Sequence, residues 1–458
     1  MKRLLFSLPY GIAFRNVVCC GILDSCLATG AEATLLFPEL SDSDRARIEQ
    51  QLPPGVEVRR LLPAGPYMSF TLLKFVKQHF YARRTGLDSF RVKNERRRRE
   101  TPLFHLGTTA LARIAESICT EEWIDHRIAH ARQPFEEYYT ALLKERHINT
   151  VVVAKPGYQP EDLALIRAAR SKKIPVISID TTWDNIVSKR PTYLPPDVLT
   201  AWSERMRDEA VEFYRMPHNS VVLTGGAQFD VFSSRDRLPA RQEFLAGLGL
   251  DPARQLVVFA LNSPVFTPQN PLYISFLLEA VRTGEIKGGP NVIIRLHPWD
   301  LVSNHDALMR EYPRVRVERP YGVPDSGSVY ECIPSRDEVV HFGALMTHAD
   351  LLVNIASTTT LDAIAADTPV VSIAFDMETA AIELSSARLY ELSHLKPIID
   401  SQAVQLVRSR EAFCEAVNAY LDDRTIDGHA RALARRDFLT FSDGGGAERI
   451  AAAIGGMS

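Results

Sequence analysis

Short apolar segments alternate with amphipathic helical segments along the chain, and this alternation limits the possible folds more than any other feature. Residues 3–8, 33–37 and 56–62 form such apolar segments near the N-terminus, and residues 150–154 and 175–179 form two more. Runs of Val, Ile and Leu bounded by Gly and Pro are typical of parallel strands that are buried on both faces. The first part of the chain is therefore predicted to be a parallel sheet covered by helices.

The same alternation returns in the second half, where strands are expected over 256–261, 291–296, 315–317, 351–355 and 370–373. Two successive strand–helix series indicate an α/β protein with two Rossmann-like domains. The expected parts are a first domain at 1–215, a second at 216–435, and a C-terminal helix at 436–458 that packs back on the first domain. Ligands of such sheets bind beyond the carboxyl ends of the strands, so we expect the site in a cleft where the two domains face each other.

Residues 65–147 interrupt the first domain as a helical insertion, because their period is helical and no strand is evident. Residues 70–81 within it are amphipathic and aromatic, and a basic cluster follows directly. That cluster consists of Arg83, Arg84, Arg91, Lys93, Arg96, Arg97, Arg98 and Arg99. Such a stretch fits a solvated helix face, or peripheral contact with an anionic membrane surface through residues 70–99. The whole chain has 53 Lys and Arg against 56 Asp and Glu, so nucleic acid is not an expected partner.

Several classes of protein are disfavoured by composition and by missing motifs. No apolar stretch reaches the length of a spanning helix, and the N-terminal apolar run is broken at Pro9, which favours a first strand over a signal peptide. The six cysteines form no CxxC pair, which predicts reduced thiols and a cytoplasmic protein rather than a disulfide framework or a zinc site. The sequence contains no HExxH, P-loop or GxSxG motif, so metalloprotease, Walker-type ATPase and serine-hydrolase functions have no support.

The sharpest chemical feature is Arg295-Leu-His297-Pro298 at the end of a predicted strand. An imidazole at that place faces the crevice, where it can donate a hydrogen bond to a phosphate, and as a cation it stabilises a departing phosphate. Arg295 offers a bidentate contact to the same group. A strand-terminal histidine that simply bonds to backbone is the alternative interpretation.

A second feature follows a later strand, where the chain runs into Ser357, Thr358, Thr359 and then a helix. Hydroxyls and free N–H groups at a helix start can bind an anion, and Asp362 in the first turn can accept hydrogen bonds from a ribose. Simple N-capping explains the same residues. The full set of predicted nucleotide- and phosphate-binding residues is Gly225, Gly226, Asn262, Ser263, Arg295, Ser357, Thr358, Thr359 and Asp362.

The first domain offers its own candidates. Asp180 and Asp184 directly follow a strand, and either can act as a general base from the opposite wall, although loop aspartates are often turn or cap residues. The segment after the first strand contains the acceptor-side candidates Tyr10, Gly11, Arg15 and Asn16. It contains no GxGxxG, which disfavours a dinucleotide site.

Three segments taken together resemble GT-B glycosyltransferases, and more narrowly bacterial enzymes of surface-polysaccharide biosynthesis. These are residues 223–230, 295–298 and 354–362, and residues 180–202 have a similar look. The resemblance covers about residues 150–450 and excludes the helical insertion. It implies transfer of a sugar from a CMP-, CDP- or UDP-linked donor to a glycan or lipid-linked glycan acceptor, with no metal and no other cofactor.

Three groups within this resemblance differ in detail. Bacterial sialyl- and polysialyltransferases pair His-Pro with a later Ser/Thr motif, as here, but their acidic-acidic-Gly motif is absent. CDP-glycerol glycerophosphotransferases share both motifs and an ending similar to residues 443–449, but residues 182–184 replace their first-domain histidine loop. Non-hydrolysing UDP-N-acetylglucosamine 2-epimerases share the fold, but residues 8–11 replace their Gly-Thr-Arg-Pro-Glu.

We therefore predict a metal-independent, nucleotide-sugar-dependent glycosyltransferase. In this interpretation His297 and residues 357–359 stabilise the leaving phosphate, Asp362 holds the ribose, and Asp184 or Asp180 is the base. A CDP-polyol phosphotransferase, a nucleotide-sugar 2-epimerase and a non-catalytic nucleotide- or glycan-binding scaffold are the alternatives.

Overall fold

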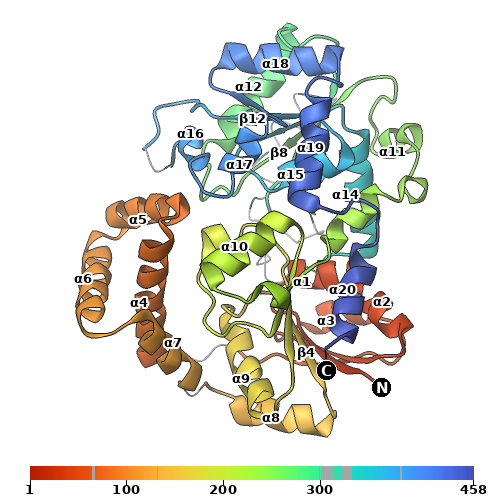
Figure 1. Ribbon diagram of the computed structural model, residues 1–458. Helices are drawn as coiled ribbons and strands as arrows, with labels where there is room; N and C mark the ends of the chain where they lie inside the picture. The colour runs from red at the N-terminus through yellow and green to blue at the C-terminus, as the bar shows by residue number, and fades with distance from the viewer. Residues whose placement is uncertain are drawn as a thin grey trace. The chain divides into compact units, whose positions relative to one another are not determined.

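The chain is built from two compact units in the computed structural model (Figure 1). The structure describes residues 1–63, 68–131, 133–298, 300, 305, 312, 315–320, 333–381 and 384–457, with side chains from residue 71 onward in the second range. One unit consists of residues 1–227 and 445–458, and the other of residues 228–444.

Seven strands in the described part of the first unit form one parallel sheet. Its order is β3-β2-β1-β4-β5-β6-β7. The strands are β1 (Arg3–Ser7), β2 (Glu32–Phe37), β3 (Glu57–Arg60), β4 (Thr150–Val153), β5 (Val176–Ile179), β6 (Val198–Ala201) and β7 (Val221–Leu223). All residues of β4 and β5 are buried, as expected for strands that are covered on both faces.

Helices cover this sheet and join its strands. They are α1 (Gly11–Phe14), the π-helix η1 (Arg15–Cys19), α2 (Ile22–Ala28), α3 (Asp42–Glu49), η2 (Pro160–Asp162), α9 (Leu163–Ser171), the π-helix η3 (Asn185–Lys189), α10 (Glu204–Tyr214), η4 (His218–Ser220) and α20 (Gly446–Gly455). No single helix in the described ranges is long and apolar enough to cross a membrane; one bent pair, Gly11–Cys19 with Ile22–Ala28, passes by length and composition only.

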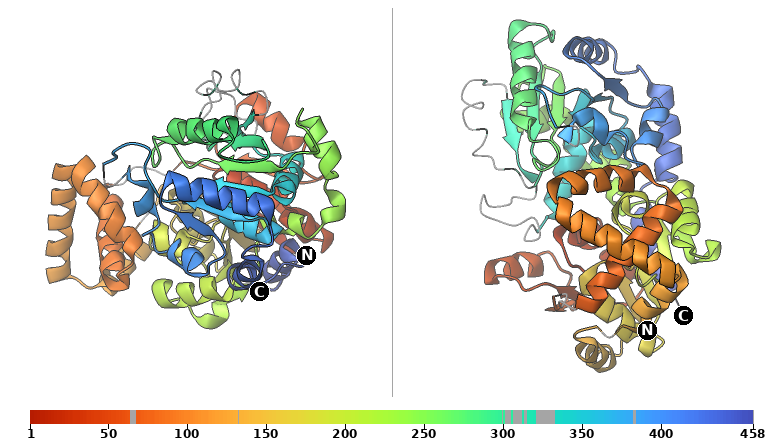
Figure 2. Two further views of the ribbon diagram at one scale, coloured as in Figure 1. Left: turned by 90° about the horizontal axis from the view of Figure 1, so that it is seen from above. Right: turned by 90° about the vertical axis from the view of Figure 1, so that its left-hand side faces the viewer.

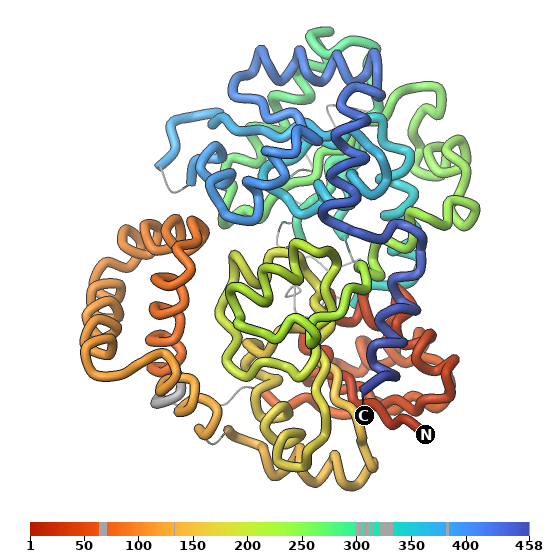
Figure 3. Tube along the Cα trace, in the orientation of Figure 1, coloured from red at the N-terminus to blue at the C-terminus, as the bar shows by residue number. Residues whose placement is uncertain are grey.

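The predicted helical insertion is present between β3 and β4. Its helices are α4 (Met68–Thr85), α5 (Asp88–Glu100), α6 (Pro102–Ile118), α7 (Glu121–His130) and α8 (Glu136–Glu145). Figures 2 and 3 show α4 to α7 as an orange group of helices to one side of the first sheet. Val76 of α4 and Ile128 of α7 nevertheless belong to the same buried cluster as Leu5 and Val151 of the sheet, so the insertion shares the core of its unit.

Six strands in the described part of the second unit form another parallel sheet, in the order β10-β9-β8-β11-β12-β13. The strands are β8 (Leu256–Ala260), β9 (Asn291–Arg295), β10 (Val315–Glu318), β11 (Leu351–Asn354), β12 (Val370–Ile373) and β13 (Gln405–Val407). The helices and turns are η5 (Ala227–Phe232), η6 (Arg235–Arg237), α11 (Arg241–Gly247), α12 (Asn270–Thr283), α14 (Arg336–His348), α15 (Thr359–Ala366), α16 (Ser386–Leu389), α17 (Lys396–Asp400), α18 (Arg410–Asp422) and α19 (Gly428–Leu439).

The division between the units differs from the expected residues 215 and 435 for local reasons. Strand β7 pairs in parallel with β6, so the chain stays in the first unit until Ala227. Helix α19 packs on α15, and Arg435 Nε donates to Ile364 O at 2.9 Å, which keeps residues 428–439 in the second unit. Only α20 returns to the first unit, where it packs on α2.

Both sheets reverse their strand order at one place. The order runs outward from β1 in one direction and from β4 in the other, and the second sheet does the same from β8 and β11. Such switch points open a crevice at the carboxyl ends of the two strands, where ligands of parallel sheets bind. The residues that follow β1 and β4, and those that follow β8 and β11, therefore define where to look for a site.

Candidate functional site

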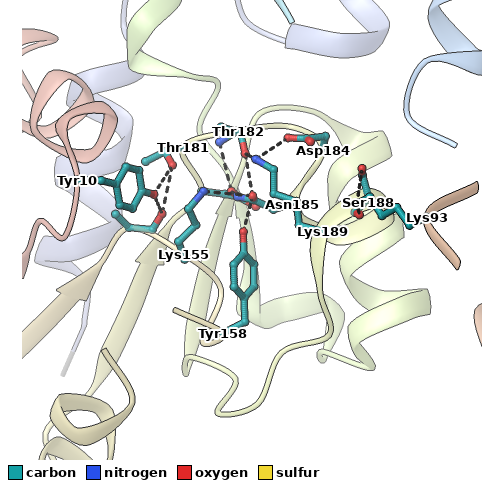
Figure 4. A network of polar contacts seen from close by, with 12 residues as sticks. Tyr10, Lys93, Lys155, Tyr158, Thr181, Thr182, Asp184, Asn185, Ser188 and Lys189 are labelled. Atoms are coloured by element: carbon teal, nitrogen blue, oxygen red, sulfur yellow. Dashed lines mark hydrogen bonds and ion pairs between the residues drawn. The ribbon is translucent and has the colours of Figure 1, made fainter. Parts of the chain in front are cut away.

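In the first unit, a tyrosine bridges the carboxyl ends of three strands at the switch point. The Tyr10 hydroxyl, which follows β1, lies 3.1 Å from Ala154 O after β4 and 3.0 Å from Thr181 Oγ1 after β5 (Figure 4). Burial raises the pKa of Tyr10 well above its usual value, so the phenol is neutral at physiological pH. Tyr10 therefore serves as a neutral hydrogen-bonding group at this edge of the sheet.

A buried lysine occupies the centre of the same edge. The Lys155 ammonium, directly after β4, lies 4.9 Å from the centre of the Tyr10 ring and 3.4 Å from Asn185 Oδ1. Burial lowers the pKa of Lys155, and the nearby carboxylates of Asp180 and Asp184 oppose that shift. The Tyr158 hydroxyl donates to the same Asn185 oxygen at 2.6 Å. Lys155 and Tyr158 were not among the site residues predicted from the sequence, although Lys155 follows a buried strand as the predicted residues do.

Asp180, which follows β5, is fully buried within this network. Its Oδ1 accepts hydrogen bonds from Asn185 Nδ2 and from the Thr182 amide, the latter at 3.4 Å. Its Oδ2 is buried and has no hydrogen-bond partner among the residues that the structure describes. Burial raises the pKa of Asp180 to about 6, against the opposing effect of Lys155. A carboxylate with a pKa near 6 suits proton transfer near neutral pH.

Asp184 has a different environment from Asp180. Its Oδ1 forms an ion pair at 3.1 Å with Lys189 Nζ, and its side chain is 11% exposed. Lys189 also donates to Thr182 Oγ1 at 3.0 Å. The structure thus brings together three of the predicted residues, Tyr10, Asp180 and Asp184. Both carboxylates are buried, but Asp184 is ion-paired with Lys189, whereas Asp180 accepts hydrogen bonds from Asn185 and Thr182. Two carboxylates whose surroundings differ in this way can take different roles in acid–base chemistry.

The helical insertion holds the loop that carries these residues. Lys93 of α5 donates through Nζ to the backbone oxygen of Ser188 in η3. The Tyr81 hydroxyl of α4 donates to Ile186 O at 2.8 Å. Burial lowers the pKa of Lys93 to about 8, with Asp184 opposing the shift. The link between the insertion and η3 has no counterpart in any sequence motif.

A glycine makes the turn between Lys155 and Tyr158 possible. Gly157 has a φ of +71°, and a Cβ there would lie 1.9 Å from the backbone oxygen of Leu194. Its own oxygen accepts hydrogen bonds at 3.0 Å from the amides of Tyr193 and Leu194. Only glycine fits both the backbone angle and the close approach.

A second buried acid lies close to the network. Ser7, the last residue of β1, donates through its hydroxyl to Asp162 Oδ1, and Asp162 has no exposed surface. Burial raises the pKa of Asp162 to about 7, and the hydrogen bond from Ser7 opposes this shift. Sequence analysis did not identify Asp162, because it reads as an ordinary residue at a helix start.

The other acceptor-side predictions lie further along the same segment. Gly11 is buried at the start of α1, and Asn16 is buried in η1. Arg15 Nε donates to Asn16 Oδ1 at 3.0 Å. Of these four predicted residues, Tyr10 is the one whose side chain takes part in the network of Lys155 and Asp180.

In the second unit, an asparagine spans the switch point. Asn262, directly after β8, donates through Nδ2 to Ile355 O after β11 at 3.1 Å, and its Oδ1 accepts from the Ser263 amide at 2.7 Å. Asn262 therefore joins the ends of β8 and β11 at the switch point, and its predicted role in nucleotide binding stays a prediction. The predicted Ser263 is buried beside it.

The Ser/Thr loop after β11 has a specific backbone shape. Ala356 has a φ of +47°, and its amide donates to the Tyr390 hydroxyl at 2.9 Å. Ser357 Oγ and Thr359 Oγ1 lie 2.8 Å apart, Thr358 is exposed, and α15 starts at Thr359. A left-handed non-glycine residue is strained and often marks a functional loop. The loop presents hydroxyls at the start of a helix, where an anion is favoured.

Buried hydrogen bonds fix this loop from below. Asn354 Nδ2 donates to Thr360 Oγ1 at 2.8 Å, and Ser372 Oγ donates to Asn354 Oδ1 at 3.0 Å. All three side chains are buried. The position of Ser357 is therefore determined by a satisfied polar network rather than by a flexible surface turn.

His297 follows β9, next to β8, and is half-buried. Burial lowers the pKa of His297 to about 4, and the Asp300 carboxylate opposes the shift. The imidazole is thus neutral at physiological pH in this structure, so it is not the preformed cation of the sequence-based interpretation. A neutral imidazole still donates one hydrogen bond, and a bound phosphate would raise its pKa.

The Arg295 guanidinium contacts three side chains of the second unit. It lies 3.3 Å from Glu318, 3.8 Å from Glu338 and 4.7 Å from the centre of the Phe342 ring. Arg319, which sequence analysis did not identify, donates through Nη2 to Pro298 O at 3.1 Å and so supports the loop of His297.

The remaining predicted residues lie in α15 and in the turn after β7. Asp362 is partly exposed in the first turn of α15, three residues beyond Thr359. Gly225 and Gly226 are buried after β7 in the first unit, whereas the other predicted phosphate ligands belong to the second. Within the described part of the chain, no group of three or more His, Cys, Asp or Glu side chains is arranged to hold a metal ion.

The chain is similar to known proteins in its structure, whereas the comparisons of its sequence found no match. No protein-family model and no curated protein matches the chain. A putative UDP-N-acetylglucosamine 2-epimerase from Listeria monocytogenes is similar with a TM-score of 0.57 and 13% identity, over 99% of this chain and 96% of that one. The UDP-GlcNAc 2-epimerase from Neisseria meningitidis, bound to UDP-GlcNAc, gives 0.57 and 12% over 99% of both chains.

A glycosyltransferase has a similar structure. WaaG, a glycosyltransferase involved in lipopolysaccharide biosynthesis, matches with a TM-score of 0.50 and 12% identity, over 99% of this chain and all of that one. At such identities the likeness shows the fold. The chain therefore has a GT-B-like fold of two Rossmann-like α/β units with a helical insertion in the first, as predicted. The narrower resemblance to sialyl- and CDP-glycerol-type transferases stays a prediction.

Proposed function

We propose that the protein is a glycosyltransferase that moves a sugar from a nucleotide-sugar donor to a glycan or lipid-linked glycan acceptor in surface-polysaccharide biosynthesis. The observation that carries the proposal is that each sheet has its own polar site at its switch point. The first unit offers carboxylates of contrasting environment, Asp180 and Asp184, and the second offers a hydroxyl-rich helix start at Ser357. Glycosyl transfer needs both kinds of group: one that takes the proton of the acceptor hydroxyl, and one that stabilises the departing nucleotide phosphate.

On the donor side, neutral groups supply the stabilisation. The hydroxyls of Ser357 and Thr359, the start of α15 and the His297 imidazole donate hydrogen bonds to the departing phosphate. His297 is neutral before the donor binds, because burial lowers its pKa to about 4. The neutral imidazole donates one hydrogen bond to the phosphate oxygen on which negative charge develops, and this bond strengthens as the charge grows. Asp362 holds the ribose.

On the acceptor side, Asp180 or Asp184 takes the proton of the acceptor hydroxyl. If Asp180 is the base, kcat/KM falls as the pH decreases below about 6, because the carboxyl is then protonated in the free enzyme. In that case Asp180→Asn abolishes the activity. Asp184→Asn remains active and shows the same fall of kcat/KM below about pH 6. The reverse pattern assigns the base to Asp184.

The test is product analysis by mass spectrometry. The purified protein is incubated with CMP-, CDP- and UDP-linked sugars, with and without glycan and lipid-linked acceptors, and with and without magnesium. The proposal predicts release of nucleotide together with an acceptor that is heavier by one sugar. His297→Ala is expected to reduce kcat by about 10²-fold, the typical loss for one transition-state hydrogen-bond donor. Unchanged transfer by this variant would overturn the role of His297.

A nucleotide-sugar 2-epimerase is the second candidate, because five of the matching structures are described as UDP-N-acetylglucosamine 2-epimerases. Residues 8–11, Leu-Pro-Tyr-Gly, depart from the Gly-Thr-Arg-Pro-Glu of that group, which is why we rank it second. Epimerisation needs no acceptor and gives an altered sugar on the same nucleotide. Release of CMP from a CDP-polyol would indicate a phosphotransferase, and nucleotide binding without turnover would indicate a scaffold.

A further inference from the structure

Helix α6 of the insertion is apolar on two opposite faces. Its inner face buries Ala112 and Ala115, and Leu111 packs against the core of the first unit. Its outer face carries Leu103, Leu106, Ile114 and Ile118, which are 85%, 68%, 59% and 78% exposed. A helix that is apolar all round is normally buried, so an outer face of this kind calls for a covering surface.

The four exposed apolar residues of the outer face lie along one stripe of α6, which also includes the exposed Gly107 and Ser117. With the exposed Ala110 these four apolar residues are spaced by three or four residues along the helix, so their side chains lie on one face. Two charged residues, Arg113 and Glu116, interrupt the 17 residues of α6. Glu116 is engaged with Arg83 at 2.7 Å and His79 at 3.4 Å, on the side of α4. The stripe itself therefore has no acidic side chain.

A basic border lies directly beside the stripe. Helix α5 ends with Arg97, Arg98 and Arg99, all exposed, and a single residue, Thr101, separates α5 from α6. Residues 88–118 contain seven basic and four acidic residues, whereas the whole chain is slightly acidic. An apolar stripe with arginines at its edge is complementary to a bilayer surface that has anionic headgroups above an acyl layer.

The apolar part of this surface differs from the predicted residues 70–81, whereas Arg97–Arg99 belong to the predicted stretch 70–99. Residues 70–81 were the expected amphipathic segment, but α4 buries Val76, Lys77 and Tyr81 in its own unit. Lys77 forms ion pairs at 2.9 Å with Glu121 and at 2.6 Å with Asp125. The apolar side of α4 is thus used mainly for packing. Leu72 of α4 is 46% exposed and Trp123 of α7 is 49% exposed, whereas the most exposed apolar side chains of the insertion lie on α6.

We propose that α6 binds an anionic lipid bilayer, with Leu103, Leu106, Ile114 and Ile118 in the headgroup–acyl boundary and Arg97–Arg99 at the lipid phosphates. The inference does not rest on the proposed reaction. It has a consequence for the site, because α5 contacts η3 through Lys93 and Ser188, so the lipid-bound helices adjoin the loop of Asp184. An acceptor carried on a lipid would then meet the site at the membrane surface.

The test is co-sedimentation of the full-length protein with vesicles of phosphatidylcholine alone and of phosphatidylcholine with phosphatidylglycerol. Strong binding is expected only with the anionic vesicles, decreasing as salt is raised. The double variant Leu106→Ser/Ile114→Ser and the triple variant Arg97→Gln/Arg98→Gln/Arg99→Gln are each expected to lose about tenfold or more of the partition coefficient. These side chains are exposed, so unchanged circular dichroism and melting temperature should accompany the loss.

Leu433→Ser is the matched control, because Leu433 is 48% exposed on α19 of the other unit. It should bind vesicles as the parent protein does. Equal binding by the α6 variant and the control would overturn the proposal, and so would equal binding to neutral and anionic vesicles.

Light scattering tests whether a second copy of the chain covers the stripe instead. A dimer that dissociates in the variant Leu106→Ser/Ile114→Ser would assign the stripe to a contact between two copies and would overturn the proposal. A variant that no longer binds vesicles but still transfers sugar to a water-soluble acceptor would show that membrane binding and the proposed reaction are independent.

Discussion

Two buried aspartates determine the acid–base properties of the polar network in the first unit. Asp180 and Asp162 are both inaccessible to solvent, and burial raises the pKa of each, to about 6 and about 7. Each has one oxygen without a hydrogen-bond partner in the described part of the chain. A buried carboxylate of this kind costs stability when it ionises, and functional sites often tolerate that cost.

Asp162→Asn should stabilise the protein relative to the parent much more at pH 8 than at pH 5. The folded-state pKa of about 7 lies above the unfolded value of about 3.9, so the unfolded chain loses its proton first as the pH rises. The parent protein therefore loses stability between about pH 4 and 7, and the asparagine variant lacks this loss. The difference in unfolding free energy between variant and parent should increase by about 2–3 kcal/mol from pH 5 to pH 8. Urea unfolding at the two pH values measures it, and an equal difference at both would contradict the buried, protonated Asp162.

Gly157→Ala should damage the site loop through a clash rather than through backbone strain alone. The new Cβ would lie 1.9 Å from Leu194 O, at a φ of +71°. Gly249→Ala is a matched control, because Gly249 has the same φ and nothing within 4 Å of its Cβ position. The control should cost about 1 kcal/mol, and Gly157→Ala at least about 2 kcal/mol more. Equal melting temperatures for the two variants would show that the loop moves freely.

Some site residues could be predicted and others could not, for physical reasons. Tyr10, Asp180 and Asp184 follow buried strands, and parallel strands bring their carboxyl ends to one edge. Lys155 also follows a buried strand, so the same argument could have predicted it. Lys93 could not have been predicted, because its contact with Ser188 joins residues 95 positions apart through the packing of the insertion. The low pKa of His297 depends on burial, which no local pattern reveals.

At the scale of elements, segments rich in β-branched residues were easier to predict than mixed or irregular ones. Strand β12 (370–373) has the expected bounds. Strands β6 and β13 were not predicted, because Val-Leu-Thr-Ala and Gln-Leu-Val contain fewer β-branched residues than Thr-Val-Val-Val of β4 or Val-Val-Ser-Ile of β12. The π-helix η3 departs from the period of 3.6 residues on which helix prediction depends.

The insertion is expected to restrain η3, and a single hydroxyl tests this. Tyr81→Phe removes the hydrogen bond to Ile186 O and retains the packing of the ring on Phe90 and Tyr214. Amides of residues 185–189 should then exchange several-fold faster by hydrogen-exchange mass spectrometry, since one hydrogen bond contributes about 1 kcal/mol. Tyr138→Phe, which removes a hydroxyl bonded to Arg60 O, should leave that segment unchanged. Identical exchange in both variants would contradict the restraint.

At the scale of the whole molecule, the chain crosses between two units twice. It leaves the first unit after Ala227 and returns at Gly445, and α20 completes the first unit by packing on α2. Each unit has a parallel sheet with a switch point and polar side chains at it. The two-domain α/β architecture was predictable from the alternation of strands and helices, whereas the bounds depended on the pairing of β7 and the packing of α19, which are tertiary contacts.

In the proposed function, the loop after β11 binds the phosphate of a nucleotide donor. The most direct test is a thermal-shift panel with CMP, CDP, UDP, GDP and ADP, first without metal and then with magnesium. One nucleotide present at about 100 times its Kd should stabilise the protein by about 2.7 kcal/mol, a shift of several degrees. Ser357→Ala should lose that shift, and Ser409→Ala, which removes the cap of α18, should retain it. No shift with any nucleotide, or an equal shift in both variants, would contradict the claim.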